Sequence, residues 1–223
     1  MKIFIATPAF DGKTHVQYAT SLSDTTSLLT QHGIGYQLCI TVSGSILSAE
    51  RNKLVSIFMQ SDCTHILCID SDLGWPAQAI PAMLLKDVEF VAGLYPTRGN
   101  KKFLFRNQTN ENGSLIVDAD KKLVKMQCIP AGFMLINRSA IEKMIEHHPE
   151  LYFEPKDKVH EGRYALFNTL LMDGEFWGED YVFCRRAEAA GIDIWIDPAI
   201  QFDHAGTLGS FAEALTDKQQ KHN

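Results

Sequence analysis

The segment His65-Ile66-Leu67-Cys68-Ile69-Asp70-Ser71-Asp72 places two carboxylates directly after a run of mostly apolar residues. An apolar run of this length, bounded by polar residues, predicts a buried strand of a parallel sheet. Ligands of open α/β sheets bind beyond the carboxyl ends of the strands, where this strand delivers Asp70 and Asp72. Two carboxylates there repel each other unless a cation lies between them, and hard divalent cations prefer oxygen ligands. The segment therefore predicts metal or phosphate chemistry at the end of a central strand.

The composition indicates one globular domain with a full hydrophobic core. The chain has 223 residues, of which 45% are hydrophobic and 22% are charged. The formal net charge of −6, without a basic stretch, argues against nucleic-acid binding. The apolar start ends at Thr7-Pro8, too early for a signal peptide, and no apolar run approaches the length of a membrane span. Five scattered cysteines without a CxxC pair predict reduced thiols in a cytoplasmic protein.

The first 95 residues alternate between predicted strands and predicted helices. Strands are expected at 2–6, 36–42, 65–69 and 88–94, and helices at about 14–31, at 47–60 and in a short segment ending near 86. This alternation predicts a Rossmann-like α/β fold, in which a mixed, mainly parallel sheet is covered by helices on both faces.

The second half of the chain departs from this rhythm and predicts a small antiparallel excursion. Short antiparallel strands are expected at 103–105, 114–117 and 122–127, followed by a strand at 133–136, helices at 138–148 and 179–190, and strands at 192–196 and 200–204. Residues 150–178 are aromatic, charged and weakly periodic, which is typical of a functional loop. The end, from about residue 216, is polar and expected to fray.

Acidic residues and a histidine in the second half could join the strand-end carboxylates. Glu179-Asp180 opens a predicted helix, where the helix dipole alone favours acidic residues. The pair also follows Phe176-Trp177-Gly178 and the irregular segment, which makes it a candidate general base at the edge of a cleft. His204 ends a late strand, and a neutral imidazole is a common metal ligand beside carboxylates, although a single histidine is more often structural.

Three further stretches have both a plain and a functional interpretation. Arg51 is either a solvated helix residue or a guanidinium placed for a diphosphate. Gly132 precedes a strand, either as a turn or to let a ligand approach the backbone. Asp118-Ala119-Asp120 repeats the spacing of the strand-end pair, but it lies between two short polar strands and is followed by two lysines. This second triplet therefore predicts a solvated hairpin turn.

Taken together, these motifs resemble the GT-A fold nucleotide-sugar glycosyltransferases, in particular the small, stand-alone, family-2-like type. The resemblance extends over nearly the whole chain, and its motifs occur in the order of the family. The matching stretches are Ile5-Ala6-Thr7-Pro8, Ala49-Glu50-Arg51-Asn52, Ile69-Asp70-Ser71-Asp72, Val91-Ala92-Gly93-Leu94-Tyr95-Pro96, Ala131-Gly132-Phe133-Met134-Leu135-Ile136, Gly178-Glu179-Asp180 and His204-Ala205-Gly206.

The resemblance implies a metal site and its ligands. Asp70 and Asp72, with Ser71 between them, correspond to the DxD motif that holds Mn²⁺ or Mg²⁺ against the donor diphosphate. Asp72 corresponds to the more direct metal ligand, and Asp70 lies nearer the ribose. His204 corresponds to the late metal ligand of the family.

The resemblance also implies contacts with the donor. Thr7 and Pro8 correspond to the loop that cups the nucleoside base, and Arg51 corresponds to a residue near the nucleotide. Gly132 and Phe133 are expected to line the sugar and acceptor side.

The acidic pair Glu179-Asp180 corresponds to the family's acidic pair near the acceptor, with Asp180 as the base that deprotonates the acceptor hydroxyl in an inverting enzyme. Glu50 departs from the family pattern, in which a small or apolar residue precedes the arginine. The expected organisation is one catalytic domain, 1–223, with a nucleotide-binding half (1–95), an acceptor-binding half (96–215) and a polar tail (216–223).

The expected function is metal-dependent transfer of a sugar from a nucleoside diphosphate donor, most simply a UDP-sugar, to a hydroxyl acceptor such as a glycan. Two alternatives remain open at this point. A nucleotidyltransferase uses similar carboxylates, but usually needs a Gly-rich basic loop after the first strand, where this chain offers only Gly12 and Lys13. A non-catalytic module that binds glycan or nucleotide would also suit the aromatic segment.

Overall fold

The computed structural model describes the backbone of residues 1–42, 44–154, 164–172 and 174–220. Most strands of the described chain form one nine-stranded mixed sheet. Its order is β2 (Gly35–Val42), β1 (Lys2–Ala9), β3 (His65–Ile69), β9 (Phe133–Asn137), β5 (Phe90–Ala92), β12 (Ile194–Ile196), β8 (Leu123–Cys128) and β6 (Arg106–Asn107), and β7 (Val117–Asp118) pairs with β8. β2, β1, β3, β5 and β12 run in one direction, and β9 and β8 run against them.

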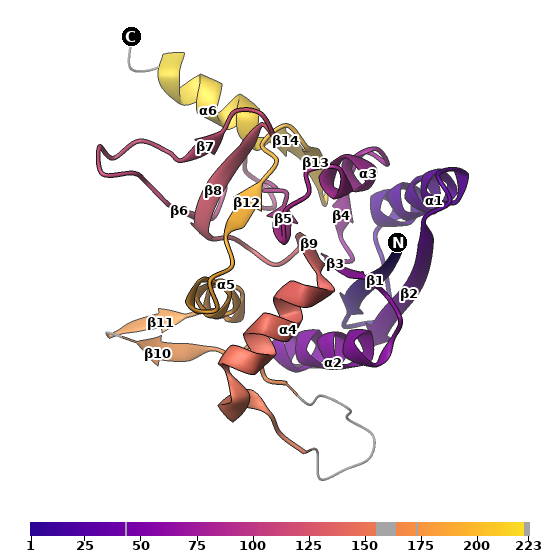
Figure 1. Cartoon of the computed structure of the whole chain (residues 1–223). Coiled ribbons are helices and arrows are strands. Elements are labelled where there is room, and N and C mark those ends of the chain that lie inside the picture. Colours follow the sequence, from indigo (N-terminus) through magenta and orange to yellow (C-terminus); the bar gives the residue numbers. More distant parts are fainter. Residues whose placement is uncertain (43, 155–163, 173, 221–223) are drawn as a thin grey trace.

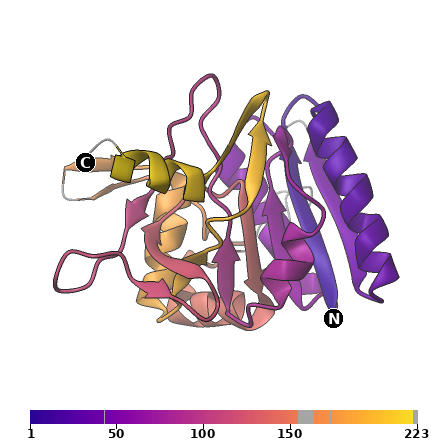
Figure 2. The same ribbon diagram turned by 90° about the horizontal axis from the view of Figure 1, so that it is seen from above.

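Helices cover both faces of this sheet, as the alternation predicts (Figure 1; Figure 2). α1 (Val16–Gln31) and α3 (Ala79–Leu84) pack on one face, and α2 (Leu47–Gln60), α4 (Arg138–His147) and α5 (Glu179–Ala189) pack on the other. Successive residues of a strand point to opposite faces, so β1 supplies Ile3 and Ile5 to the first layer and Phe4 and Ala6 to the second. This double burial explains why the central strands are apolar throughout.

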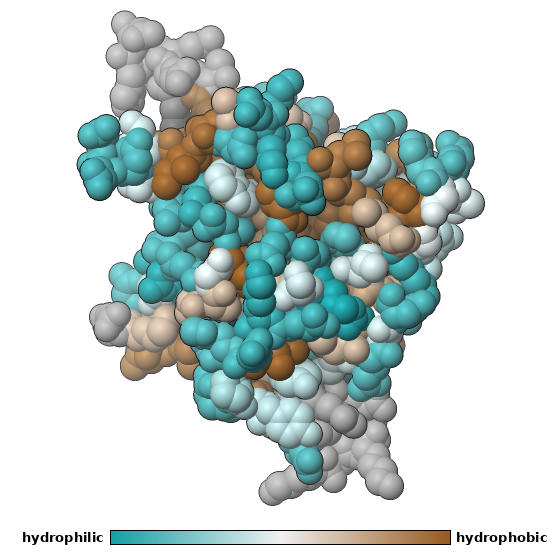
Figure 3. Space-filling model, in the orientation of Figure 1, coloured by the Kyte–Doolittle hydropathy of each residue, from teal (hydrophilic) through white to brown (hydrophobic). Residues whose placement is uncertain are grey.

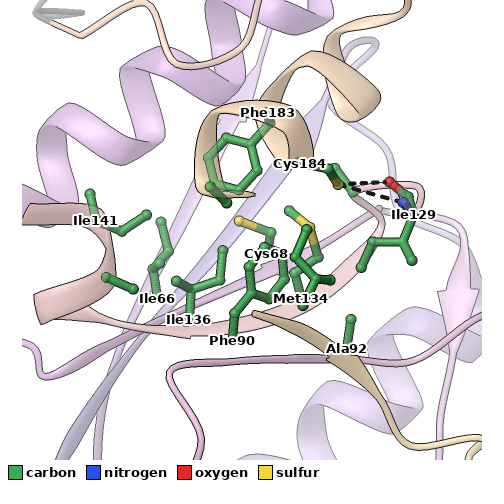
Figure 4. Packing of buried hydrophobic residues seen from close by; sticks show 14 of the residues in the cluster. Ile66, Cys68, Phe90, Ala92, Ile129, Met134, Ile136, Ile141, Phe183 and Cys184 are labelled. Atoms are coloured by element: carbon green, nitrogen blue, oxygen red, sulfur yellow. Dashed lines mark hydrogen bonds between the residues drawn. The ribbon is translucent and has the colours of Figure 1, made fainter. Parts of the chain in front are cut away.

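The core beneath α4 and α5 is formed by side chains from several strands (Figure 4). Phe183 of α5 lies over Phe90, and the two ring centroids are 6.1 Å apart. Cys184 meets the loop before β9, where its Sγ accepts from the Ile129 backbone N–H at 3.5 Å. All five cysteines are free thiols. The core thus fixes the start of α5, which carries the predicted acidic pair.

A three-stranded antiparallel sheet brings the end of the chain to the strand-end carboxylates. β13 (Gln201–His204) pairs with β14 (Thr207–Ser210) and with β4 (Leu73–Gly74). The register aligns His204 with Leu73, the residue after Asp72. Residues that are 132 positions apart in the sequence therefore become neighbours.

The remaining elements are short. β10 (Leu170–Met172) and β11 (Glu175–Trp177) form a two-stranded antiparallel sheet, a 3₁₀ turn spans Pro149–Leu151, and α6 (Phe211–Gln220) ends the described chain. No helix within the described ranges is both long and apolar enough to cross a bilayer. The surface in Figure 3 is mostly hydrophilic and has scattered hydrophobic patches.

Several sequence expectations need correction. β9 inserts antiparallel between β3 and β5, which the alternation of the first 95 residues does not reveal. No strand forms at 103–105; the strand of that region is β6. The polar end is helical as far as residue 220 instead of fraying from 216, because α6 begins with the buried Phe211. The Asp118-Ala119-Asp120 turn is confirmed as the link between the paired strands β7 and β8.

Candidate active site

A cleft of about 270 Å³ opens at the carboxyl ends of β1, β2 and β3. Twelve residues line it: Pro8, Ala9, Phe10, Thr41, Gly44, Ser45, Leu47, Glu50, Asp70, Ser71, Asp72 and Arg98. The chain places the cleft where open α/β sheets bind ligands, because the strands β1, β2 and β3 are parallel and end together.

Asp72, which lines this cleft, forms a buried carboxylate–imidazole pair with His204. Asp72 Oδ2 lies 3.1 Å from His204 Nε2, and their side chains are 7% and 13% exposed. His204 donates its Nδ1–H to the Pro96 carbonyl at 2.7 Å, which directs Nε2 toward the carboxylate. Arg98 completes the cluster, since its Nη2 forms an ion pair with Asp72 and its Nε lies 3.3 Å from His204 Nε2.

The cluster shifts the pKa values of its members in opposite directions. Burial raises the pKa of Asp72, but the hydrogen bond with His204 and the charges of His204 and Arg98 lower it overall. Burial lowers the pKa of His204, but its contacts with Asp72 and the Pro96 carbonyl raise it overall. Asp72 is therefore ionised near neutral pH and is able to bind a cation.

The residues present suit a hard divalent cation, but they supply only part of its coordination shell. A carboxylate oxygen and an imidazole nitrogen, oriented by a carbonyl on its far side, are suitable donors for Mn²⁺. Among the described residues, no three His, Cys, Asp or Glu side chains converge on one metal position. Asp72 and His204 would therefore hold the ion together with water and phosphate oxygens of a bound substrate, as is usual for Mg²⁺ in nucleotide enzymes.

Asp70, the third expected metal ligand, turns instead toward a buried arginine. Arg51 Nη2 donates to Asp70 Oδ1 at 2.9 Å, and Arg51 Nε lies 3.9 Å from Asp180 Oδ1. The Arg51 side chain is 4% exposed, whereas those of Asp70 and Asp180 are each 26% exposed. Burial lowers the pKa of Arg51, but the two carboxylates raise it overall, so the guanidinium stays charged. Arg51 thus links the strand-end carboxylate to the helix-start carboxylate from beneath the cleft.

Asp180 lies in the first turn of α5, after the N-cap Gly178. Burial raises the pKa of Asp180 to about 6, with Glu179 and Asp70 adding to the rise and Arg51 opposing it. A carboxylate with this pKa is mostly ionised at neutral pH and is a stronger base than an ordinary aspartate. Its Oδ1 has no hydrogen-bond partner in the described chain. Asp180 is therefore the residue of this cluster best suited to accept a proton.

Gly132 allows a close contact that holds Asp70 in place. The Asp70 N–H donates to the Gly132 carbonyl at 3.0 Å, and the Gly132 N–H donates to the Tyr95 hydroxyl at 3.1 Å. A Cβ at residue 132 would overlap the Tyr95 hydroxyl and lie 2.6 Å from Asp70 Oδ2. The glycine is thus required by its neighbours, which is a more specific role than a plain turn.

Comparisons with known proteins give similarity only at the level of the fold. No protein-family model and no curated protein matches this sequence. The catalytic domain of Drosophila β1,4-galactosyltransferase 7, solved with xylobiose, is 16% identical with a TM-score of 0.49, over 91% of this chain and 70% of that one. S. aureus TarS with UDP-GlcNAc is 11% identical with a TM-score of 0.45, over 88% of this chain and 56% of that one.

A third solved structure, a glycosyltransferase involved in glycosylation of the PBCV-1 major capsid, is 12% identical with a TM-score of 0.37, over 72% of each chain. TM-scores below 0.5 at these identities do not decide a family, and the chemistry of this chain follows from its own residues.

Two expected donor contacts lie away from the cleft. Thr7 is fully buried, and its hydroxyl lies 2.6 Å from the Tyr18 hydroxyl, so its side chain does not face the cleft. Phe133 is also fully buried and packs against Trp75 and Phe202. Pro8 and Ser71, in contrast, line the cleft, and their contact with a donor stays a prediction.

Sequence reasoning missed several residues that line the cleft. Glu50 is 9% exposed, and its Oε2 has no hydrogen-bond partner among the described residues. Its carboxyl group lies against Gly44, where a Cβ would leave no room for it. Arg98 follows the end of β5, so the rule that ligands bind beyond strand ends could have identified it. Glu50 was visible only as a departure from the family pattern.

Proposed function

We propose that this chain is a metal-dependent glycosyltransferase that moves a sugar from a nucleoside diphosphate donor, such as a UDP-sugar, to a hydroxyl acceptor with inversion. One observation carries the proposal: Asp72, which lines the strand-end cleft, pairs with His204, and Arg51 lies between Asp70 of the same cleft and a base with a raised pKa, Asp180. The order of motifs shared with GT-A glycosyltransferases supports the same assignment.

The proposed reaction is a single displacement. The acceptor oxygen attacks the anomeric carbon while its proton passes to Asp180, and the bond between that carbon and the diphosphate oxygen breaks. Asp72 and His204 would hold a divalent ion, which would neutralise the diphosphate charge as a Lewis acid. With a pKa of about 6, Asp180 is mostly ionised near neutral pH, and its Oδ1 lies 3.9 Å from Arg51 Nε.

The test is release of UDP from a panel of UDP-sugars with Mn²⁺ and a hydroxyl acceptor such as a simple glycoside. Asp180→Asn is expected to lower the release rate by about 10²–10⁴-fold, the usual contribution of a general base, and to leave UDP binding near that of the wild type. Asp120→Asn, in the hairpin turn, is the matched control and is expected to keep full activity.

Three results would count against the proposal. Undiminished release after addition of a chelator contradicts the metal, and loss of UDP binding in Asp180→Asn assigns that residue a structural role. UDP binding without release from any donor favours a binding module instead of an enzyme.

A further inference from the structure

Arg98, which lines the cleft, contacts both members of the Asp72–His204 pair. Its guanidinium reaches both Asp72 Oδ2 and His204 Nε2, the two atoms suited to a divalent cation. The Arg98 side chain is 65% exposed, whereas its partners are almost buried. The exposed guanidinium of Arg98 thus contacts two metal-donor atoms that are otherwise buried.

Hydrogen bonds hold the backbone on both sides of Arg98, whereas its side chain is 65% exposed. The Thr97 N–H donates to the Lys102 carbonyl at 2.7 Å, which closes the turn. The Gly99 N–H donates to the Thr207 hydroxyl at 3.0 Å, which attaches the turn to the β13–β14 hairpin. Gly99 has a φ of +72°, a conformation that suits glycine. Rotation of the Arg98 side chain therefore needs no movement of the turn.

We propose that Arg98 exchanges between the Asp72–His204 pair and the diphosphate of the nucleotide, and that this exchange makes metal and nucleotide binding cooperative. The inference rests on the proposed function, since it concerns the same cleft.

The exchange follows from charge and from shared atoms. A divalent cation that takes Asp72 Oδ2 and His204 Nε2 must displace the guanidinium, because both cations need the same lone pairs and repel each other. The displaced guanidinium stays in the same cleft, where a diphosphate offers it charge-assisted hydrogen bonds. Hydrogen bonds to the nucleotide thereby replace the contacts that Arg98 loses when the metal binds. Each ligand is then expected to raise the affinity for the other by the same factor.

The experiment measures binding of Mn²⁺, by electron paramagnetic resonance, with and without UDP. Arg98→Met keeps the length of the side chain and removes its charge. Without UDP, this variant is expected to bind Mn²⁺ about fivefold more tightly than the wild type, the upper value for an exposed ion pair. The factor by which UDP raises Mn²⁺ affinity is expected to be smaller in Arg98→Met. Lys101→Met, an exposed cation in the same turn, is the control and is expected to behave like the wild type.

Each other outcome overturns the proposal in a distinguishable way. If Arg98→Met binds Mn²⁺ no more tightly, or UDP raises its Mn²⁺ affinity by the wild-type factor, Arg98 does not exchange and the proposed function stands. If Lys101→Met gains as much Mn²⁺ affinity as Arg98→Met, the gain comes from the change in net charge and not from competition for Asp72 and His204. If Asp72→Asn binds Mn²⁺ as the wild type does, the metal site of the proposed function is wrong, and the role of Arg98 falls with it.

Discussion

Replacing Asp180 by asparagine is expected to stabilise the fold while it removes the proposed base. The folded protein holds the pKa of Asp180 at about 6, against an ordinary value of 3.8. A raised carboxyl pKa means that the folded state disfavours the charged form. The difference of about 2 in pKa, at about 1.4 kcal/mol for each unit, corresponds to about 3 kcal/mol of lost stability when Asp180 is ionised.

The sign and the pH range follow from proton linkage. Between about pH 4 and pH 6 the folded state binds more protons at Asp180 than the unfolded state does, so the stability of the wild type falls as pH rises. Above pH 6 the loss is complete, and below pH 4 it is absent. Asparagine removes this loss but also removes a negative charge at a helix N-terminus, which costs about 0.3–1 kcal/mol. The expected net gain at pH 8 is therefore about 2 kcal/mol.

The assay is urea unfolding of both proteins at pH 8 and near pH 4. The advantage of Asp180→Asn is expected at pH 8 and is expected to vanish near pH 4. Glu179→Gln, one residue earlier in the same helix turn, measures the helix-dipole contribution separately. If Asp180→Asn is less stable than the wild type at pH 8, burial does not destabilise the charged form of Asp180. The same follows if the stability difference between the two proteins is equal at both pH values.

Three further predictions concern the same cluster. Gly132→Ala is expected to destabilise the fold by about 1–3 kcal/mol in urea unfolding, because its Cβ overlaps the Tyr95 hydroxyl and crowds Asp70; unchanged stability contradicts the close contact. Arg51→Met is expected to cost about 3–5 kcal/mol in the same assay, since two partly buried carboxylates lose their cation; a cost below 1 kcal/mol contradicts its linking role. The rate of UDP release is expected to fall tenfold per pH unit below about pH 6, as Asp180 takes up a proton; a rate that is flat from pH 5 to pH 7 excludes Asp180 as the base.

The fold was largely predictable because the sequence signals that specify its elements lie in neighbouring residues. The apolar runs, the helix periodicity and the position of Gly33, which has a φ of +67° after α1, each depend on neighbouring residues. The insertion of β9 between β3 and β5 is not local, since it depends on which strand edges meet in the folded core. The same holds for β13 and β4, which bring His204 to Asp72.

The site was predictable in its residue types but less so in its contacts. Sequence placed Asp70 and Asp72 at a strand end and separated them correctly from the hairpin turn at Asp118-Ala119-Asp120. It could not show that Asp70 faces a buried Arg51, because that contact depends on how α2 packs beneath the strand ends. The contacts of Arg98 were not visible either, since its partner His204 arrives from β13, 106 residues later.

The most direct test of the account is calorimetric titration of UDP into the wild type and into Asp72→Asn, each with and without Mn²⁺. Mn²⁺ is expected to strengthen UDP binding to the wild type, and Asp72→Asn is expected to lose this gain. Asp120→Asn, which changes a carboxylate of the same spacing in the hairpin turn, is expected to keep it. UDP binding that is indifferent to Mn²⁺, or a gain that survives in Asp72→Asn, would contradict the central claim that the strand-end carboxylate serves a metal-bound diphosphate.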